Sequence, residues 1–189
     1  TSKLSKHLNI IGGFAFKSEK FRKKGIPVLR IGNINLGYFN PTNLVYYDYN
    51  ALLSKYIVKP GELVISLTGT VGKDDYANIC MLKNDFDIYY LNQRNAKLEL
   101  FKTLNKYYLI NVLRIPSVKH KLTNINRGVR QANVSNNDIL NLEIPIPPIE
   151  LQNQFADFVE KVEAVKSKVK QSLAQLEMLK KSLMQKYFG

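Results

Sequence analysis

The stretch that decides the fold is Ile144-Pro-Ile-Pro-Pro148, followed at Glu150 to Phe188 by ELQNQFADFVEKVEAVKSKVKQSLAQLEMLKKSLMQKYF. The three prolines are incompatible with a helix interior, so a helix can begin only after them. Glu150 suits the positive N-terminal end of such a helix, and the lysines near residue 186 suit its negative end. We therefore predict one helix from Glu150 to Phe188, about 55–60 Å long at roughly 1.5 Å per residue.

Apolar residues recur along this helix at alternating spacings of three and four, interrupted only by Ser172. They are Phe155, Phe158, Val162, Val165, Val169, Leu176, Leu179 and Leu183. Such a heptad pattern predicts a dimerisation seam that packs against another helix. Val159 and Leu173 widen the stripe, so the partner is another helix, the rest of the chain, or both. The alternative is a helix folded back on its own core, but the length and the single stripe favour a projecting rod.

Length and composition limit the class of protein to which the chain can belong. The chain has 189 residues with 45% hydrophobic content, enough for one core plus the helix. No apolar run approaches 18 residues, and the N-terminal Thr1 to His7 lacks the apolar stretch of a secretion signal. The single cysteine, Cys80, permits no internal disulfide and agrees with a reducing compartment. We therefore expect a cytoplasmic protein.

The net charge of +13 is concentrated before the helix. Residues 1–148 hold 21 Lys/Arg against 10 Asp/Glu, whereas residues 149–189 hold 7 against 5. Such an excess favours a polyanion, nucleic acid above all. An AT-rich genome would also produce 22 lysines and 19 asparagines without selection for binding. A membrane surface is disfavoured, because the lysines do not gather along one face of an apolar helix.

Short elements dominate residues 1–148, and their pattern predicts an α+β fold in which strands outnumber helices. The predicted strands cover residues 26–34, 62–68, 87–90 and 141–146. Residues 106–115 have a helical period that Pro116 ends, and residues 135–140 read as a capped helical turn. The fold class is thus a strand-rich α+β globular domain followed by one long C-terminal coiled-coil helix.

Several polar clusters carry the hydroxyl, amide and guanidinium groups that contact phosphates and base edges. Lys17 and Ser18 follow a Gly-Gly-Phe segment, and Arg30 and Asn33 lie at the end of a predicted strand. The densest set is Asn126 to Asn133. Together with two further segments, the candidate DNA contacts are Lys17, Ser18, Arg30, Asn33, Thr68, Thr70, Lys73, Gln93, Arg94, Arg127, Arg130 and Gln131. For Arg30 and Arg94, a role in bracing strands against buried carboxylates is an equal alternative.

No catalytic or metal-binding pattern accompanies these clusters. The segment Gly69 to Lys73 resembles a phosphate-binding loop, but Leu67 and Asp74 occupy places where a Walker loop needs Gly and Ser or Thr. Asp74-Asp75 reads as a turn more readily than as a metal pair. The two isolated histidines assemble no zinc site. We therefore expect no catalytic residue, no metal and no cofactor in this chain, which favours a binding module.

Six blocks of sequence, taken in order, resemble the specificity subunit of type I restriction-modification systems. They are Gly13-Phe-Ala-Phe-Lys-Ser, Ile26-Pro-Val-Leu-Arg-Ile-Gly-Asn-Ile, Gly61-Glu-Leu-Val-Ile-Ser-Leu-Thr-Gly-Thr-Val-Gly-Lys, Leu91-Asn-Gln-Arg, Gln131-Ala-Asn-Val-Ser and Ile144-Pro-Ile-Pro-Pro-Ile-Glu-Leu-Gln. The resemblance implies a target recognition domain at residues 1–148 that reads double-stranded DNA, and a spacer and dimerisation helix at residues 149–189. It implies methyltransferase subunits and a restriction or motor subunit as partners, which bind S-adenosylmethionine, ATP and Mg themselves.

The chain departs from the family pattern in number, since a standard specificity subunit has two recognition domains and two spacer helices. It resembles half a subunit, or the C-terminal half of one, whose helix should pair antiparallel with a second copy or a like half. Two identical halves would read a palindromic bipartite site. The rival interpretations are a nucleic-acid-binding coiled-coil adaptor and, less favoured, a nuclease or methyltransferase that acts alone.

Overall fold

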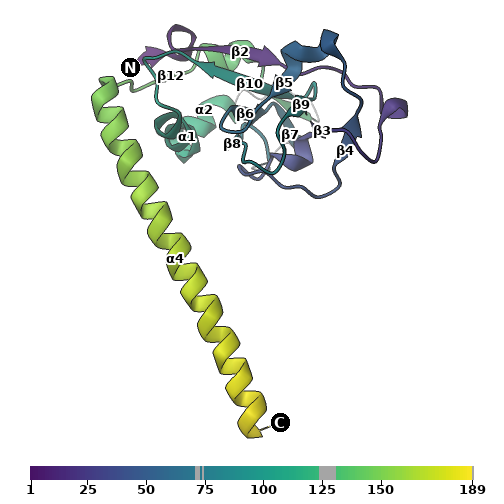
Figure 1. The fold of residues 1–189 in the computed structure, drawn as a ribbon. Coiled ribbons are helices and arrows are strands. Elements are labelled where there is room, and N and C mark those ends of the chain that lie inside the picture. Colours follow the sequence, from purple (N-terminus) through teal and green to yellow (C-terminus); the bar gives the residue numbers. More distant parts are fainter. Residues whose placement is uncertain (71–72, 74, 124–130, 189) are drawn as a thin grey trace.

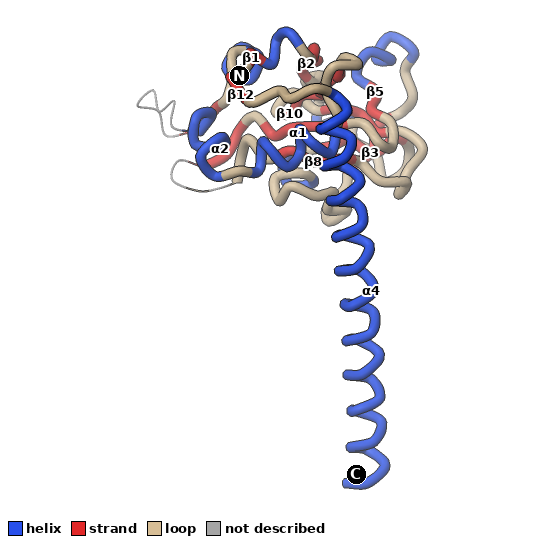
Figure 2. The backbone as a smooth tube through the Cα atoms, turned by 90° about the vertical axis from the view of Figure 1, so that its left-hand side faces the viewer, coloured by secondary structure: helices blue, strands red, loops and turns tan. Residues whose placement is uncertain are grey.

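A computed structural model describes residues 1–70, 73, 75–123 and 131–188, with Gln131 described by its backbone alone. One long helix, α4 (Ile149–Phe188), projects from a globular head that contains every other element (Figure 1). The helix begins directly after the prolines and runs for 40 residues, which confirms the predicted rod. Figure 2, turned by 90°, shows the same projection, with only the first turns of α4 beside the head.

The head is built from twelve short strands and three shorter helices within the described residues. The strands are β1 (Ser2–Lys3), β2 (Leu8–Gly12), β3 (Ile26–Leu29), β4 (Val45–Tyr47), β5 (Ile57–Val58), β6 (Leu63–Ser66), β7 (Thr68–Thr70), β8 (Ile79–Met81), β9 (Tyr89–Leu91), β10 (Asn95–Leu100), β11 (Gln131–Asn133) and β12 (Glu143–Ile144). The helices are α1 (Lys106–Arg114), α2 (Pro116–Thr123) and α3 (Asn136–Leu140). This arrangement confirms the α+β class.

A central antiparallel sheet with the strand order β2-β10-β6-β8 organises the head. Both of its faces are covered, which explains why β6 reads as a continuous apolar run. Leu63 and Ile65 face the core formed with α1 and α2, whereas Val64 faces a second core that contains Leu29 and Tyr89. Figures 1 and 2 both show α1 and α2 together on one side of the strands.

A second four-stranded sheet, β4-β3-β9-β5, packs on the other face of the central sheet. Its outer face carries an aromatic cluster in which Phe16 contacts Phe14, Tyr47 and Tyr90, with ring centroids 4.9–5.1 Å apart. The parallel pair β3–β9 places Leu29 beside Leu91, so both strands end at the same place. Helices, central sheet and second sheet thus form three layers.

Several predicted elements differ from the structure, and the strand predicted for residues 141–146 is confined to β12, Glu143–Ile144. The strand predicted for residues 26–34 ends at Leu29, and a 3-10 turn follows at Ile31–Asn33 because the Asn33 side chain accepts the Arg30 backbone N–H at 3.0 Å. Pro116 does end α1, but it also begins α2, a position where proline's missing N–H costs nothing. Strand β10 in the middle of the central sheet and strand β2 at its edge were not predicted.

The first turns of α4 are fixed to the head by one buried amide. Gln152 is fully buried, and its Oε1 accepts the Asn105 backbone N–H at 2.9 Å. Its Nε2 donates to the carbonyls of Thr103 at 3.1 Å and Pro147 at 2.8 Å. Ala156 is buried beside it. The pKa of the Tyr107 phenol on α1 is raised, first by a hydrogen bond to Glu160 on α4 and secondly by burial. The helix therefore leaves the head in a defined direction.

Candidate nucleic-acid interface

Three segments with predicted contacts leave the central sheet at the same end. Strand β2 ends at Gly12, β6 ends at Ser66 and β10 begins at Asn95, and the register pairs Gly12 with Ala96 and Ser66 with Asn95. We call this the loop end of the sheet. The C-terminal end of β10 lies opposite and leads through Thr103 and Asn105 to the α4 junction. The loops and the rod therefore leave from opposite ends of the sheet.

Asn95 ties the loop end together from a fully buried position. Its Nδ2 donates to the Leu29 carbonyl at 2.7 Å, its backbone N–H donates to Asn92 at 3.0 Å, and its carbonyl accepts from Gly13 at 3.0 Å. The Asn95 Oδ1 atom has no hydrogen-bond partner among the described residues. Sequence reasoning did not single out Asn95, because nothing local distinguishes it from the other asparagines.

The loop after β2 lies directly against the turn before β10. A Cβ at Gly13 would lie 2.0 Å from the Asn92 carbonyl oxygen, so this approach requires glycine. The Gln93 backbone N–H donates to the Phe14 carbonyl at 2.9 Å. Four of the predicted contacts, Lys17, Ser18, Gln93 and Arg94, are exposed on these two adjoining segments.

The predicted threonines are held by the protein itself. Thr68 is buried and its Oγ1 donates to Asn133 Oδ1 at 2.8 Å, whereas Thr70 donates through its backbone N–H and its Oγ1 to Asp75, at 2.8 and 2.9 Å. Asp75 thus caps the turn after β7. Lys73 is exposed on that turn. These hydrogen bonds fix the position of the turn. Both threonine hydroxyls already donate to groups of the protein itself.

Strand β11 pairs with β7 and contains the described part of the densest predicted cluster, residues 131–133. The register places Gln131 opposite Thr70 and Asn133 opposite Thr68. Arg127 and Arg130 lie outside the described residues. Their neighbour Gln131 begins β11.

Arg30 and Asn33 stabilise a loop in the structure. Asn33 is only 2% exposed, and its Nδ2 donates to the carbonyls of Asn40 at 3.0 Å and Thr42 at 3.1 Å. The Arg30 guanidinium donates to the Asn43 carbonyl. The Asn33 amide is thus engaged within the protein, and its contact with a base edge stays a prediction. The partner of Arg30 is a backbone carbonyl rather than the buried carboxylate of the bracing alternative, and its contact with DNA stays a prediction.

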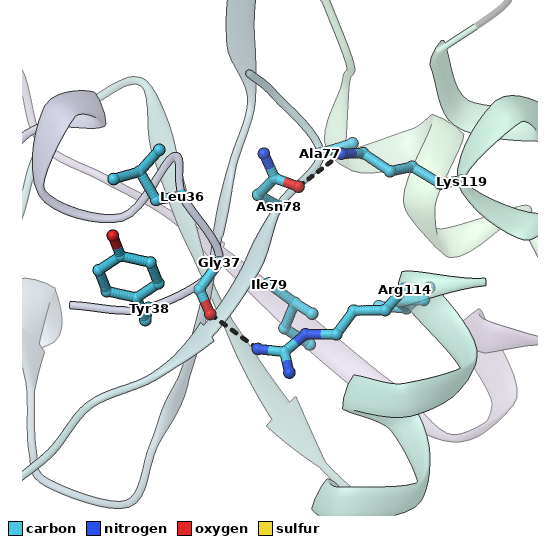
Figure 3. A pocket seen from close by; sticks show the side chains of 9 residues that line it. Leu36, Gly37, Tyr38, Ala77, Asn78, Ile79, Arg114 and Lys119 are labelled. Carbon is cyan, nitrogen blue, oxygen red and sulfur yellow. Dashed lines mark hydrogen bonds between the residues drawn. The ribbon is translucent and has the colours of Figure 1, made fainter. Parts of the chain in front are cut away.

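A polar pocket of about 380 Å³ extends the loop end along β8 and contains two cations that sequence reasoning missed (Figure 3). Arg114 donates from Nη2 to the Gly37 carbonyl at 2.7 Å, and Lys119 donates from Nζ to Asn78 Oδ1 at 2.5 Å. None of the lining residues is a carboxylate. Arg114 is exposed, so its guanidinium adds positive charge to this surface. Sequence reasoning missed it because only the packing of α1 places it here.

The apolar seam of α4 is mostly uncovered. Seven of its eight residues are 39–64% exposed, and Val162 is half-buried; the seven are Phe155, Phe158, Val165, Val169, Leu176, Leu179 and Leu183. Phe155 also contacts the Tyr108 ring of α1, with centroids 5.9 Å apart. Towards the C-terminus the apolar surface broadens to include Met184, Tyr187 and Phe188.

The described residues lack two further features. They contain no cluster of three or more His, Cys, Asp or Glu side chains arranged to hold a metal ion. They also contain no helix with the length and apolarity needed to span a membrane.

Comparison with known proteins places these features in a family. Residues 1–178 match the family described as type I restriction modification DNA specificity domain. The MjaVIII specificity subunit of Methanocaldococcus jannaschii is 26% identical over 188 residues, which cover 96% of this chain and 43% of that protein. The EcoBI specificity subunit of Escherichia coli is 27% identical over 174 residues, 90% of this chain and 33% of that protein.

Solved structures share the fold. The HsdS subunit from Thermoanaerobacter tengcongensis has a TM-score of 0.61 at 20% identity, covering 99% of this chain and 44% of that one. A chain from a type I restriction-modification assembly has a TM-score of 0.66 at 17% identity, covering 97% and 43%. This chain therefore spans less than half the length of the relatives that it matches. Because the family match extends over the head and most of α4, the chain belongs to the type I restriction-modification DNA specificity family.

Proposed function

We propose that this chain reads one half of a bipartite site in double-stranded DNA and directs partner methyltransferase and restriction subunits to that site. The observation that carries the proposal is the convergence of separate segments at the loop end. The loops after β2 and before β10, the β7 turn and β11 all meet there. Exposed polar side chains on a fixed sheet end suit recognition without chemistry.

In this mechanism, cations hold the phosphates and a few polar side chains read base edges. Lys17, Lys73 and Arg94 are exposed at the loop end, and Arg114 extends the positive surface along β8. Gln93 and Gln131 supply amides suited to adenine edges, and Arg127 and Arg130 supply guanidiniums suited to guanine. The head carries the excess of positive charge that this role requires.

The chain contributes no chemistry of its own in this proposal. Partner methyltransferase subunits flip an adenine out of the duplex and methylate it, and a restriction or motor subunit adds cleavage. S-adenosylmethionine, ATP and Mg belong to those subunits, and the complex works in the cytoplasm. The exposed seam of α4 holds a second copy or a like half, so that two heads engage one site.

The test is to express the chain with its neighbouring methyltransferase subunit in cells free of DNA methylation and to map modified adenines across the genome. We expect a split motif, palindromic if the chain pairs with itself. The matched control carries Leu176→Lys and Leu179→Lys, which leave the head intact and place charge in the seam. Genome-wide absence of a motif, although the complex forms and the head is folded, would refute the proposal for this chain.

A further inference from the structure

We propose that the polar pocket along β8 binds a small nucleoside phosphate, with the phosphate on Arg114 and Lys119 and the base against the Tyr38 ring. This inference goes beyond the proposed function, because it concerns a free small molecule rather than duplex DNA. The pocket has a volume of about 380 Å³, and its lining comes from the loop before β4, from β8 and from the helices α1 and α2 (Figure 3). Pockets for small ligands typically have volumes of about 300–1,000 Å³, so this one is large enough for a single small ligand.

The charge of the pocket favours an anion. Arg114 and Lys119 both line it, and none of its lining residues is Asp or Glu. A second polar pocket, of about 300 Å³ beside α3, contains Lys121 but also Asp138 and Glu143, so acids lie beside the cation there. The pocket along β8 therefore carries a positive charge that its own lining does not balance, which attracts an anionic group.

Arg114 is held in place while most of its donors stay available. Its Nη2 donates to the Gly37 carbonyl at 2.7 Å, the only hydrogen bond that this guanidinium makes within the described part of the chain. A guanidinium has five N–H donors in a planar fork that matches the oxygens of a phosphate. Because the Gly37 carbonyl already fixes the fork, less conformational entropy is lost when a phosphate binds.

Lys119 supplies a second positive charge from the next helix. The residue is half-buried, and its Nζ donates to Asn78 Oδ1 at 2.5 Å. The Asn78 Nδ2 in turn donates to the Asn35 carbonyl at 2.5 Å, so this one amide joins α2 to the loop before β4. The ammonium attracts a phosphate in the pocket even while its bond to Asn78 is kept.

The loop that carries Tyr38 is fixed by hydrogen bonds within the protein itself. The buried Asn33 amide donates to the carbonyls of Asn40 at 3.0 Å and Thr42 at 3.1 Å. Gly37 has a φ of +77°, which glycine adopts without strain. The wall of the pocket that this loop forms is therefore largely preformed, as is usual for small-ligand sites.

Apolar surface beside the cations determines what the anion is attached to. The Tyr38 and Leu36 side chains are 59% and 55% exposed at the rim. Three buried apolar residues, Ala77, Ile79 and Leu113, also line the pocket. Figure 3 shows Leu36 and Tyr38 on the other side of the pocket from the helices that carry the cations. An exposed tyrosine ring is a surface on which any base can stack, so a nucleoside phosphate uses both walls of the pocket.

The test is to titrate the full chain, labelled with ¹⁵N, with AMP and to follow the backbone amide signals by NMR. We expect saturable shifts confined to the pocket, at Gly37, Asn78, Ile79 and their neighbours. Adenosine lacks the phosphate and inorganic phosphate lacks the base, so each should bind roughly tenfold or more weakly than AMP. Equal binding of AMP and inorganic phosphate would overturn the nucleoside part of the proposal.

Two variants test the two walls separately. Arg114→Gln should weaken AMP binding by roughly tenfold or more, because charge-assisted hydrogen bonds are lost. Tyr38→Leu should weaken the binding of AMP but not that of inorganic phosphate, and the exposure of Tyr38 keeps this variant folded if Arg114→Gln is not. The matched control is Arg22→Gln, since Arg22 lies outside the pocket and pairs with Asp48 at 3.5 Å.

Unchanged AMP binding in the control, with the expected losses in both test variants, supports the site. Equal losses in the Arg22 and Arg114 variants would overturn it, because the positive head as a whole would then attract the anion. If AMP shifts no signals but a DNA duplex shifts the same amides in an Arg114-dependent way, the pocket holds the DNA backbone and the proposal is wrong. Absence of shifts with every ligand would also refute it.

Discussion

Replacing Gln152 with Ala should destabilise the head and loosen α4, although the residue lies on a helix whose outer surface is exposed. The side chain forms three hydrogen bonds, with the Asn105 N–H and with the Thr103 and Pro147 carbonyls, at 2.8–3.1 Å. Each partner left unpaired costs about 1 kcal/mol or more. The sum predicts a loss of about 3 kcal/mol, or a fall in Tm of roughly 6–12 °C for a chain of this size.

Urea denaturation and thermal unfolding of the purified chain measure this loss. The matched control is Gln154→Ala, because Gln154 is an exposed glutamine two residues away on the same helix. Surface substitutions of this kind usually change stability by no more than about 0.5 kcal/mol. Hydrogen exchange should also quicken in the first turns of α4 in the Gln152 variant. Equal stability of the two variants would refute the reasoning that one amide fixes the rod to the head.

Three other predictions concern the head. If Arg114 contacts a phosphate, Arg114→Ala should weaken duplex binding for all sequences alike and reduce the slope of log K against log salt concentration by about one. An unchanged slope in a salt titration would exclude that contact. Arg130→Ala should cost about 1–3 kcal/mol and relax specificity at one base pair, as measured by competition with single-base variants. Cys80 should resist thiol reagents until the chain unfolds. Burial raises the pKa of the Cys80 thiol in the folded chain from 9.0 to about 12. Stability should therefore be unaffected by this thiol below pH 9 and should fall as the pH rises towards 12. In alkaline denaturation, the stability of Cys80→Ala should depend less steeply on pH.

The long helix was predictable because all of its signals are local. The prolines before it, its heptad spacing and its terminal charges all lie within about 45 residues, and the observed start at Ile149 differs from the prediction by one residue. Strand β10 also carries a local signal, since Ala96, Leu98 and Leu100 alternate with Lys97 and Glu99. The strand was not predicted, because the predicted strands were the conspicuous apolar runs on either side of it.

The site was less predictable, because side-chain direction depends on packing between distant segments. Asn33 and Thr68 have the right chemistry for a DNA contact, but the fold turns them inward. Asn95 and Arg114 gain their positions from strands and helices that the sequence does not place relative to one another. The exposed Lys17, Gln93 and Arg94 lie at one end of the sheet, and whether they contact DNA stays a prediction.

The bonds that Asn95 makes to backbone atoms have a consequence for how new specificities arise. Its partners are the Leu29 and Asn92 carbonyls and the Gly13 N–H. Every residue type has these backbone groups, except that proline lacks the N–H. The outward side chains at positions such as 17, 93 and 94 can therefore be exchanged without disturbing the network beneath them. Stability and recognition are then inherited separately. Under the proposed function, selection for a new DNA target can act on these loops at little cost to folding while the scaffold stays the same.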